Sequence, residues 1–174
     1  MRVMIEQAAE AHYQALRNLF QLYRYDLSPI HQNPPDADGR FDQADLDLRL
    51  QQAGVAWFVI RYDATLAGFA AVTRSSRLNQ PYDGHAVSEF FVLRALRRKT
   101  IGSRAAVLLF DQLPGHWEVA TPANNTVATA FWRAVADRYS NGAYQELWLQ
   151  RDGWRGNIER FSSPGGLPHA AHPA

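Results

Sequence analysis

The stretch Phe91-Val-Leu-Arg-Ala-Leu-Arg-Arg-Lys-Thr-Ile-Gly-Ser-Arg-Ala-Ala106 decides the fold of this chain. It begins within residues 87–93, a run rich in β-branched and aromatic residues that predicts a strand. It ends within residues 103–113, a segment that predicts a helix. Between Arg94 and Arg104 lie five positive charges in eleven residues, with no acidic residue among them. A strand that turns into a helix points backbone N–H groups and the positive end of the helix dipole at the turn. The sequence therefore predicts a turn that binds a polyphosphate.

Gly102 supports this interpretation, because a residue without Cβ lets a ligand approach the main chain closely. A solvated basic turn without a ligand is the plainer alternative. Binding of nucleic acid is disfavoured, because the net charge is only +1 and no second basic stripe extends the turn.

The segments on either side of this turn predict an alternation of strands and helices. Apolar residues at three- and four-residue spacing predict helices at 8–27, 43–52, 103–113 and 126–138. Short runs of β-branched and aromatic residues predict strands at 3–5, 56–62, 66–73, 87–93, 117–121, 145–149 and 157–161. Hairpins around one strand–helix–strand unit predict an α/β (α+β) fold, with a mixed, mostly antiparallel twisted sheet of about six to seven strands and about four flanking helices.

Length and composition limit the classes of protein to consider. The chain has 174 residues, 47% of them hydrophobic and 20% charged, which predicts one globular domain over 1–161. The last residues, 162–174, have nothing to pack and are expected to be disordered. The apolar runs are too short to span a membrane, so a cytoplasmic protein is the expectation. The chain has no cysteine and its six histidines do not cluster, so no metal site is predicted.

The basic turn resembles the acetyl-CoA motif of the GNAT superfamily, Gln/Arg-x-x-Gly-x-Gly/Ala. Arg97 takes the first position and Gly102 the last, while Thr100 stands where the family usually has a glycine. The later segment Asn125-Thr-Val-Ala-Thr-Ala-Phe-Trp132 is similar to the family's Asn-x-x-Ala-x-x-Phe-Tyr. More narrowly, the chain resembles short bacterial GNAT proteins known only as predicted acetyltransferases.

The resemblance implies an N-acetyltransferase that moves the acetyl group of acetyl-CoA to a primary amine by direct attack. The residues then expected to bind acetyl-CoA are Val92, Leu93, Arg97, Arg98, Lys99, Thr100, Ile101, Gly102, Ser103, Asn125 and Trp132. A GNAT-fold module that binds CoA without catalysis is the alternative, because of the departures at Thr100 and Trp132.

Glu89 is the candidate general base for the amine. Its side chain alternates with Val87, Phe91 and Leu93, so we expect it to share their apolar face, where burial would raise its pKa. The family often places a catalytic glutamate on this strand. A structural glutamate that pairs with an arginine or reaches solvent is the alternative, and Glu118 on the following strand is the reserve candidate.

The general acid and the acceptor site are less defined by the sequence. Trp132 stands where the family often has a tyrosine, and an indole cannot give up a proton usefully. Packing in the core and packing against the pantetheine are the two alternatives for Trp132, and Tyr139 lies further downstream. Tyr25 and Asp26, before the proline-rich segment 28–39, are the candidates for recognition of a small-molecule or peptide amine. No nucleic-acid or membrane partner is expected, and a homodimer is possible.

Overall fold

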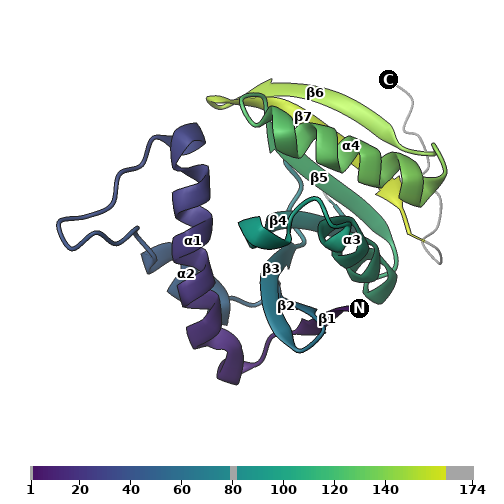
Figure 1. Ribbon diagram of the computed structural model, residues 1–174. Coiled ribbons are helices and arrows are strands. Elements are labelled where there is room, and N and C mark those ends of the chain that lie inside the picture. Colours follow the sequence, from purple (N-terminus) through teal and green to yellow (C-terminus); the bar gives the residue numbers. More distant parts are fainter. Residues whose placement is uncertain (1, 79–81, 164–174) are drawn as a thin grey trace. The chain divides into compact units, whose positions relative to one another are not determined.

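The computed structural model describes residues 2–78 and 82–163 (Figure 1). By contacts between Cα atoms the chain forms two compact units, one made of 1–72 with 89–102 and the other of 73–88 with 103–174. Residue 162, the first of the predicted disordered tail, ends a strand, and the residues of that tail from 164 onward lie outside the described residues.

Seven strands and four α-helices make up the regular structure of the described residues. The strands are β1 Val3–Gln7, β2 Ala56–Tyr62, β3 Thr65–Thr73, β4 Gly84–Val92, β5 His116–Pro122, β6 Gln145–Arg151 and β7 Trp154–Ser162. The helices are α1 Tyr13–His31, α2 Ala44–Gln51, α3 Ile101–Gln112 and α4 Thr126–Ser140, with short 3₁₀ turns η1 Glu10–His12 and η2 Arg94–Leu96. The strand order is β1-β2-β3-β4-β5-β7-β6, with β4 and β5 parallel. The predicted mixed, mostly antiparallel fold is confirmed.

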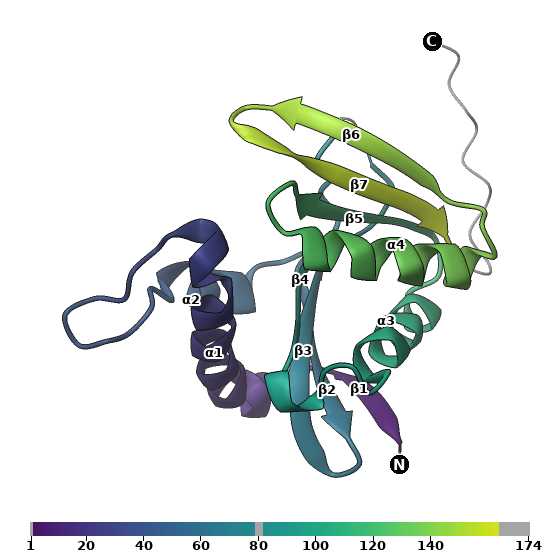
Figure 2. The ribbon, with the colours of Figure 1, turned by 45° about the horizontal axis from the view of Figure 1, so that its top comes forward.

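The first unit has a core between two helices and the sheet. In the views of Figures 1 and 2, α1 and α2 lie together beside β2 and β3. The side chains that form this core alternate along the strands and recur every three to four residues along the helices, as each type of element requires. They are Leu16, Leu19, Phe20, Leu46, Leu50, Trp57, Val59, Phe69, Ala71 and Phe91.

Helix α1 runs four residues further than the sequence predicts. It ends at His31 and contains Pro29, although a proline cannot donate a hydrogen bond to the carbonyl four residues before it. That carbonyl belongs to Tyr25, and the Ser28 hydroxyl donates to it at 2.7 Å. The serine thus replaces the missing backbone donor, and the helix continues to Gln32, which adopts a left-handed conformation as its cap.

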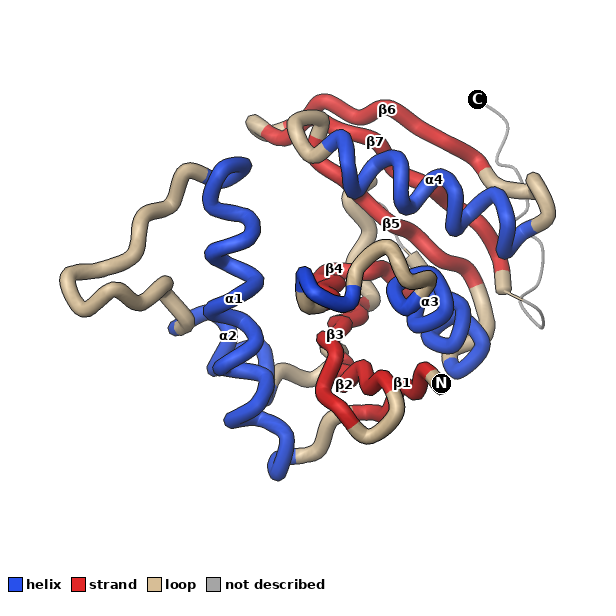
Figure 3. The backbone as a smooth tube through the Cα atoms, in the orientation of Figure 1, coloured by secondary structure: helices blue, strands red, loops and turns tan. Residues whose placement is uncertain are grey.

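The second unit packs α4 along β5 and β7, as the tube in Figure 3 shows. Its core is aromatic, with Phe110 against Trp117 and Phe161 at 4.7 and 4.9 Å between ring centroids. The predicted hairpin of β6 and β7 is confirmed, but its link is only Asp152-Gly153. Both residues have positive φ, 52° and 77°, as a type I′ turn requires.

Candidate functional site

The basic turn, residues 94–102, continues β4 directly. η2 follows the strand, with the Leu96 N–H donating to the Leu93 carbonyl at 2.8 Å, and α3 begins at Ile101, two residues earlier than predicted. Arg98 and Thr100 both have positive φ, 58° and 60°. Left-handed residues in a turn can gather successive N–H groups into a concavity that binds anions, and the N-terminus of α3 adds positive potential.

Thr100 takes up the backbone conformation for which a glycine is the usual choice. A left-handed φ brings Cβ close to the following carbonyl and costs about 1–2 kcal/mol in an ordinary residue, and β-branched residues tolerate it poorly. The Thr100 hydroxyl donates to the Lys99 carbonyl at 2.6 Å. The sequence departure from the family motif therefore leaves the turn in a glycine-like, strained conformation.

Two arginines of the basic turn bind inside the first unit. Arg97 donates through Nε to the Val92 carbonyl at 2.8 Å, and Arg94 and Arg97 each form an ion pair with one oxygen of Asp26. Burial alone would raise the pKa of Asp26, but the hydrogen bonds from the two arginines outweigh burial and hold this pKa below its ordinary value. Asp26, expected to recognise the acceptor, instead ties α1 to the basic turn, while the neighbouring Tyr25 is 64% exposed.

Glu89 lies on β4 with only 16% of its side chain exposed. Its Oε2 accepts a hydrogen bond from the Tyr23 hydroxyl, and its Oε1 pairs with Nη1 of Arg49, each at 2.6 Å. Burial, together with the negative charge of Glu89, raises the pKa of Tyr23 well above its usual range, so this phenol stays protonated and donates. This pairing with an arginine is the contact that was expected if Glu89 had a structural role.

The backbone at the end of β4 is held closely by β3. The Leu93 N–H donates to the Ala67 carbonyl at 2.8 Å. A Cβ added at Gly68 would lie 1.9 Å from the Phe91 carbonyl oxygen, so β3 can approach β4 here only through a glycine. Because peptide groups alternate along a strand, the Val92 N–H points to the edge opposite Leu93, toward the side on which β4 pairs with β5 earlier in the strand.

The other predicted cofactor residues belong to the second unit, which begins again at Ser103 in α3. Asn125 caps α4, and its side-chain oxygen accepts from the Ala128 N–H at 3.2 Å. Trp132 is buried at 7% exposure, with its ring 4.8 Å from Phe131 and 6.5 Å from Phe110. The structure thus gathers Glu89, Val92, Leu93 and 97–102 in one unit, and Ser103, Asn125 and Trp132 in the other.

The two remaining acid–base candidates are engaged in structural contacts. Glu118, the reserve base, is 1% exposed and accepts hydrogen bonds from the Ser76 hydroxyl and the Arg77 N–H, both at 2.7 Å, which fixes the segment after β3. The Tyr139 hydroxyl donates to Asp111 at 2.8 Å, and burial together with this contact raises the pKa of Tyr139 well above its usual range.

Glu159, on β7, is a buried carboxylic acid that sequence reasoning missed. It is 0% exposed, and neither of its carboxylate oxygens has a hydrogen-bond partner among the described residues. Burial and the nearby charge of Glu146 raise its pKa to about 7. The alternation of Glu159 with Phe161, whose ring lies in the core, is the signal that could have placed this glutamate on the buried face.

The described residues provide neither a metal-binding cluster nor a membrane-spanning helix. They contain no group of three or more histidine, cysteine, aspartate or glutamate side chains arranged to hold a metal ion. None of their helices is both long and apolar enough to cross a membrane.

A mixed sheet in which a basic turn leads from a central strand into a helix is the arrangement of an acetyl-CoA-dependent acyltransferase. The sequence model of the acetyltransferase (GNAT) family matches residues 13–136. The chain belongs to this family, and it is an N-acetyltransferase with acetyl-CoA as its acetyl donor.

Solved structures of acetyltransferases share the fold. One, described as histone acetyltransferase HPA2 and related acetyltransferase from Corynebacterium glutamicum, is 12% identical, with a TM-score of 0.69 over 98% of this chain and 100% of that one. The ribosomal-protein-S18-alanine N-acetyltransferase from Escherichia coli is 13% identical, with a TM-score of 0.59 over 97% and 99%. AAC(6')-Iy, in complex with the bisubstrate analog CoA-S-monomethyl-acetylneamine, is 22% identical, with a TM-score of 0.54 over 78% and 90%. No curated protein sequence matches the chain significantly.

Proposed function

We propose that the protein transfers an acetyl group to a primary amine by direct attack of the amine on acetyl-CoA, with Glu89 as the general base. The observation that carries this proposal is the continuity of segment 89–102. One stretch of chain bears a half-enclosed carboxylate on β4 and, a few residues later, a turn suited to a diphosphate. The proposed base and the turn that would bind the acetyl donor therefore belong to one segment of backbone. This is a basis for the proximity that acyl transfer requires.

The basic turn has the chemistry to hold the diphosphate of acetyl-CoA. The backbone N–H groups from Arg98 to Gly102 would bind phosphate oxygens, and the side chains of Arg98 and Lys99 would add positive charge. Arg97 would act indirectly, because its guanidinium is bound to Val92 and Asp26. The Val92 N–H is the better backbone donor to the pantetheine, because the Leu93 N–H is bonded to Ala67. The roles of Ser103, Asn125 and Trp132 in binding acetyl-CoA stay predictions from the sequence.

The reaction requires a neutral amine, because an ammonium has no lone pair with which to attack. Bound acetyl-CoA supplies a thioester carbonyl. As the nitrogen–carbon bond forms and the carbon–sulfur bond breaks, Glu89 would take the proton that the amine loses, and CoA would leave as a thiolate that gains its proton from water. A thiolate is a tolerable leaving group, since a thiol has a pKa of about 8–9. The chain has no cysteine, which fits direct transfer without an acyl-cysteine.

The acceptor would be a small-molecule or peptide amine. The structures with the same fold include a ribosomal-protein-S18-alanine N-acetyltransferase and a complex with an acetylneamine analog, so both types of amine belong in a screen. Tyr25 is the acceptor contact that we retain, because its ring is exposed on α1, the helix that also carries Tyr23. Asp26 is better suited to ordering the basic turn.

Two measurements test this function. Calorimetry should detect binding of acetyl-CoA, and a double reversal, Arg98→Glu with Lys99→Glu, should weaken it strongly. Release of free thiol from acetyl-CoA in the presence of an amine panel should then identify an acceptor. A folded protein that binds acetyl-CoA but releases thiol with no amine would instead be the catalytically silent module, and one that binds no CoA or thioester would contradict the proposal altogether.

A further inference from the structure

The Glu89 carboxylate is held by two donors that come from two different helices. Tyr23 on α1 donates to Oε2, and Arg49 on α2 binds Oε1, each at 2.6 Å. A carboxylate offers about four lone-pair sites, so one donor to each oxygen leaves sites for a further hydrogen bond. The arrangement fixes the plane of the carboxylate and still permits it to accept a proton.

Both donors are themselves fixed by aromatic contacts. The Tyr23 ring lies against Phe69 at 5.5 Å in an edge-on arrangement and against Phe91 at 5.7 Å. The Arg49 guanidinium lies over the Trp57 ring at 5.4 Å, and the Trp57 indole N–H donates to the Arg49 carbonyl at 3.2 Å. Side chains packed in this way lose little further freedom when they donate, so each holds its hydrogen bond in one direction.

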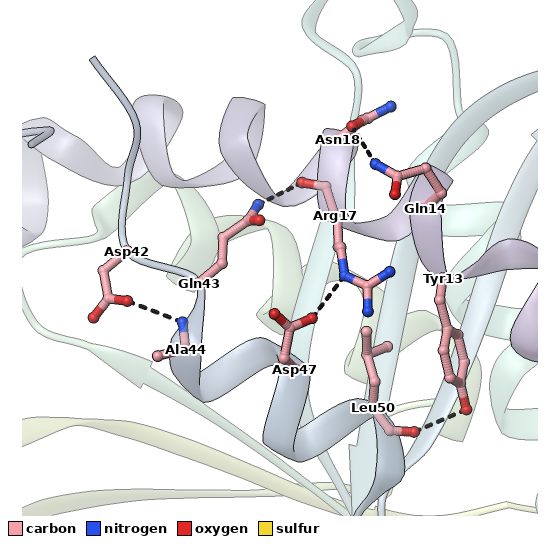
Figure 4. Close-up of polar contacts among 9 residues, drawn as sticks. All are labelled: Tyr13, Gln14, Arg17, Asn18, Asp42, Gln43, Ala44, Asp47 and Leu50. Atoms are coloured by element: carbon pink, nitrogen blue, oxygen red, sulfur yellow. Dashed lines mark hydrogen bonds and ion pairs between the residues drawn. The ribbon is translucent and has the colours of Figure 1, made fainter. Parts of the chain in front are cut away.

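The backbone that carries Arg49 is also tied to α1, as Figure 4 shows. Arg17 on α1 binds Asp47 at 2.7 Å, and Gln43 donates to the Arg17 carbonyl at 2.6 Å. At the other end of α2 the Tyr13 hydroxyl donates to the Leu50 carbonyl at 2.9 Å. Leu50 is itself buried. The two donors to Glu89 therefore stand on helices joined at both ends of α2.

We infer that Arg49 and Tyr23 are positioning residues, which hold the Glu89 carboxylate in the orientation from which it takes the proton of the acceptor amine. This inference rests on the proposed role of Glu89 as the general base. A misdirected base loses rate even where its chemistry is unchanged, because small errors of placement are costly in a catalytic site.

The test compares four variants by their kcat and by their KM for acetyl-CoA. The structure shows Glu89 bound by Tyr23 from α1 and by Arg49 from α2, and Arg49 also pairs with Asp45 at 3.7 Å. Arg49→Gln removes both the positive charge and the planar guanidinium. Arg49→Lys keeps the charge only, and Tyr23→Phe removes one hydrogen bond. Arg17→Gln is the matched control, because it breaks an arginine–carboxylate pair between α1 and α2 without touching Glu89.

Arg49→Gln should lower kcat on the order of ten-fold, because Glu89 loses the donor that holds Oε1. Arg49→Lys should lower kcat less, because an ammonium can still donate to the carboxylate but lacks the fixed geometry of the guanidinium. Tyr23→Phe should lower kcat by a smaller factor than Arg49→Gln, and Arg17→Gln should leave kcat unchanged. KM for acetyl-CoA should stay within about two-fold of its original value in all four variants.

A second readout needs no acceptor. In protein with ¹³C-labelled glutamate, the signal lost in Glu89→Gln identifies the Glu89 carboxyl, and its chemical shift should change in Arg49→Gln and in Tyr23→Phe but not in Arg17→Gln. An unchanged kcat and an unchanged chemical shift in both Arg49→Gln and Tyr23→Phe would overturn the positioning role, while a slow Glu89→Gln variant would leave the base in place. Full activity in Glu89→Gln would overturn both roles and leave acetyl transfer itself established.

Discussion

Each unit of the molecule buries a glutamate on a strand, but the two carboxylates have opposite surroundings. In the first unit Glu89 meets a hydroxyl donor and a guanidinium, one at each oxygen. In the second unit Glu159 is fully buried, and among the described residues neither of its oxygens has a partner. Burial raises the pKa of Glu159 to about 7, with the charge of Glu146 adding to the effect. Burial alone therefore does not identify a general base. The groups that contact the carboxylate determine what chemistry it can perform.

The largest expected effect comes from Glu89→Gln. Loss of the proposed general base should lower kcat about 100-fold or more, because a positioned base contributes roughly 10²–10⁴-fold. The assay is thiol release from acetyl-CoA with the acceptor found in the amine panel. Glu159→Gln is the matched control, since it makes the same change at a buried carboxylate of the other unit, and it should keep kcat within about two-fold. A control variant as slow as Glu89→Gln would remove the distinction between the two sites.

Glu159→Gln should instead change stability. The folded-state pKa of Glu159, about 7, lies above the ordinary 4.5, so the folded chain binds more protons than the unfolded chain between these values. The contribution of this group is therefore fully present below pH 4.5 and is lost as pH rises through 7, a loss of about 2–3 kcal/mol. Chemical denaturation at pH 5, 6, 7 and 8 should show this decline in the original protein and a flatter curve in the variant. Parallel curves would mean that Glu159 titrates alike in both states.

One turn in each unit allows positive φ to be compared with and without a Cβ. Thr100 in the basic turn is strained at φ 60°, whereas Gly153 in the β6–β7 hairpin adopts 77° without a Cβ. Thr100→Gly should raise the free energy of unfolding by about 0.5–1 kcal/mol, the relief of strain less the added freedom of the unfolded chain. Gly153→Ala should lower it by about 1 kcal/mol. Denaturation in urea measures both, and equal signs would contradict the assigned strain.

The smallest effect is expected at Asp26, a second carboxylate with partners in the first unit. Its pKa is lowered by Arg97 and Arg94, so its contribution is present above the ordinary value of 3.8 and is lost as pH falls through the lower folded-state value. Asp26→Asn should cost at most about 1 kcal/mol, because one of its two arginines is exposed. Calorimetry should show roughly two- to five-fold weaker binding of acetyl-CoA, as the basic turn loses its tie to α1. Unchanged binding would separate Asp26 from the order of this turn.

The sequence predicted the elements that its local patterns specify. The strand at 87–93, the helix after it and the closing hairpin follow from periodicity and turn residues, and the basic turn with Thr100 was found from charge and motif alone. The predicted end of α1 at residue 27 was wrong, because the hydroxyl of Ser28 replaces the hydrogen-bond donor that Pro29 lacks. Composition does not reveal this compensation. Periodicity likewise gave no sign of the η2 turn.

Partners distant in sequence were the other omission. Glu89 was placed on the apolar face correctly, but Arg49 lies 40 residues away and Tyr23 lies 66 residues away, and no local signal joins them to it. Asp26 was predicted as an acceptor contact because it precedes the proline-rich segment 28–39, whereas the arginines that pair with it come from beyond β4. Only the tertiary fold brings these charges together.

Tyr23 and Asp26 lie three positions apart in α1, so they project from the same side of the helix, about one turn apart. The first contacts Glu89, and the second contacts the arginines of the basic turn. A roll or slide of α1 about its own axis would consequently disturb both the proposed proton acceptor and the proposed binding turn for the nucleotide. Substitutions that loosen this helix, however far from either contact, should impair turnover and donor affinity together rather than one at a time.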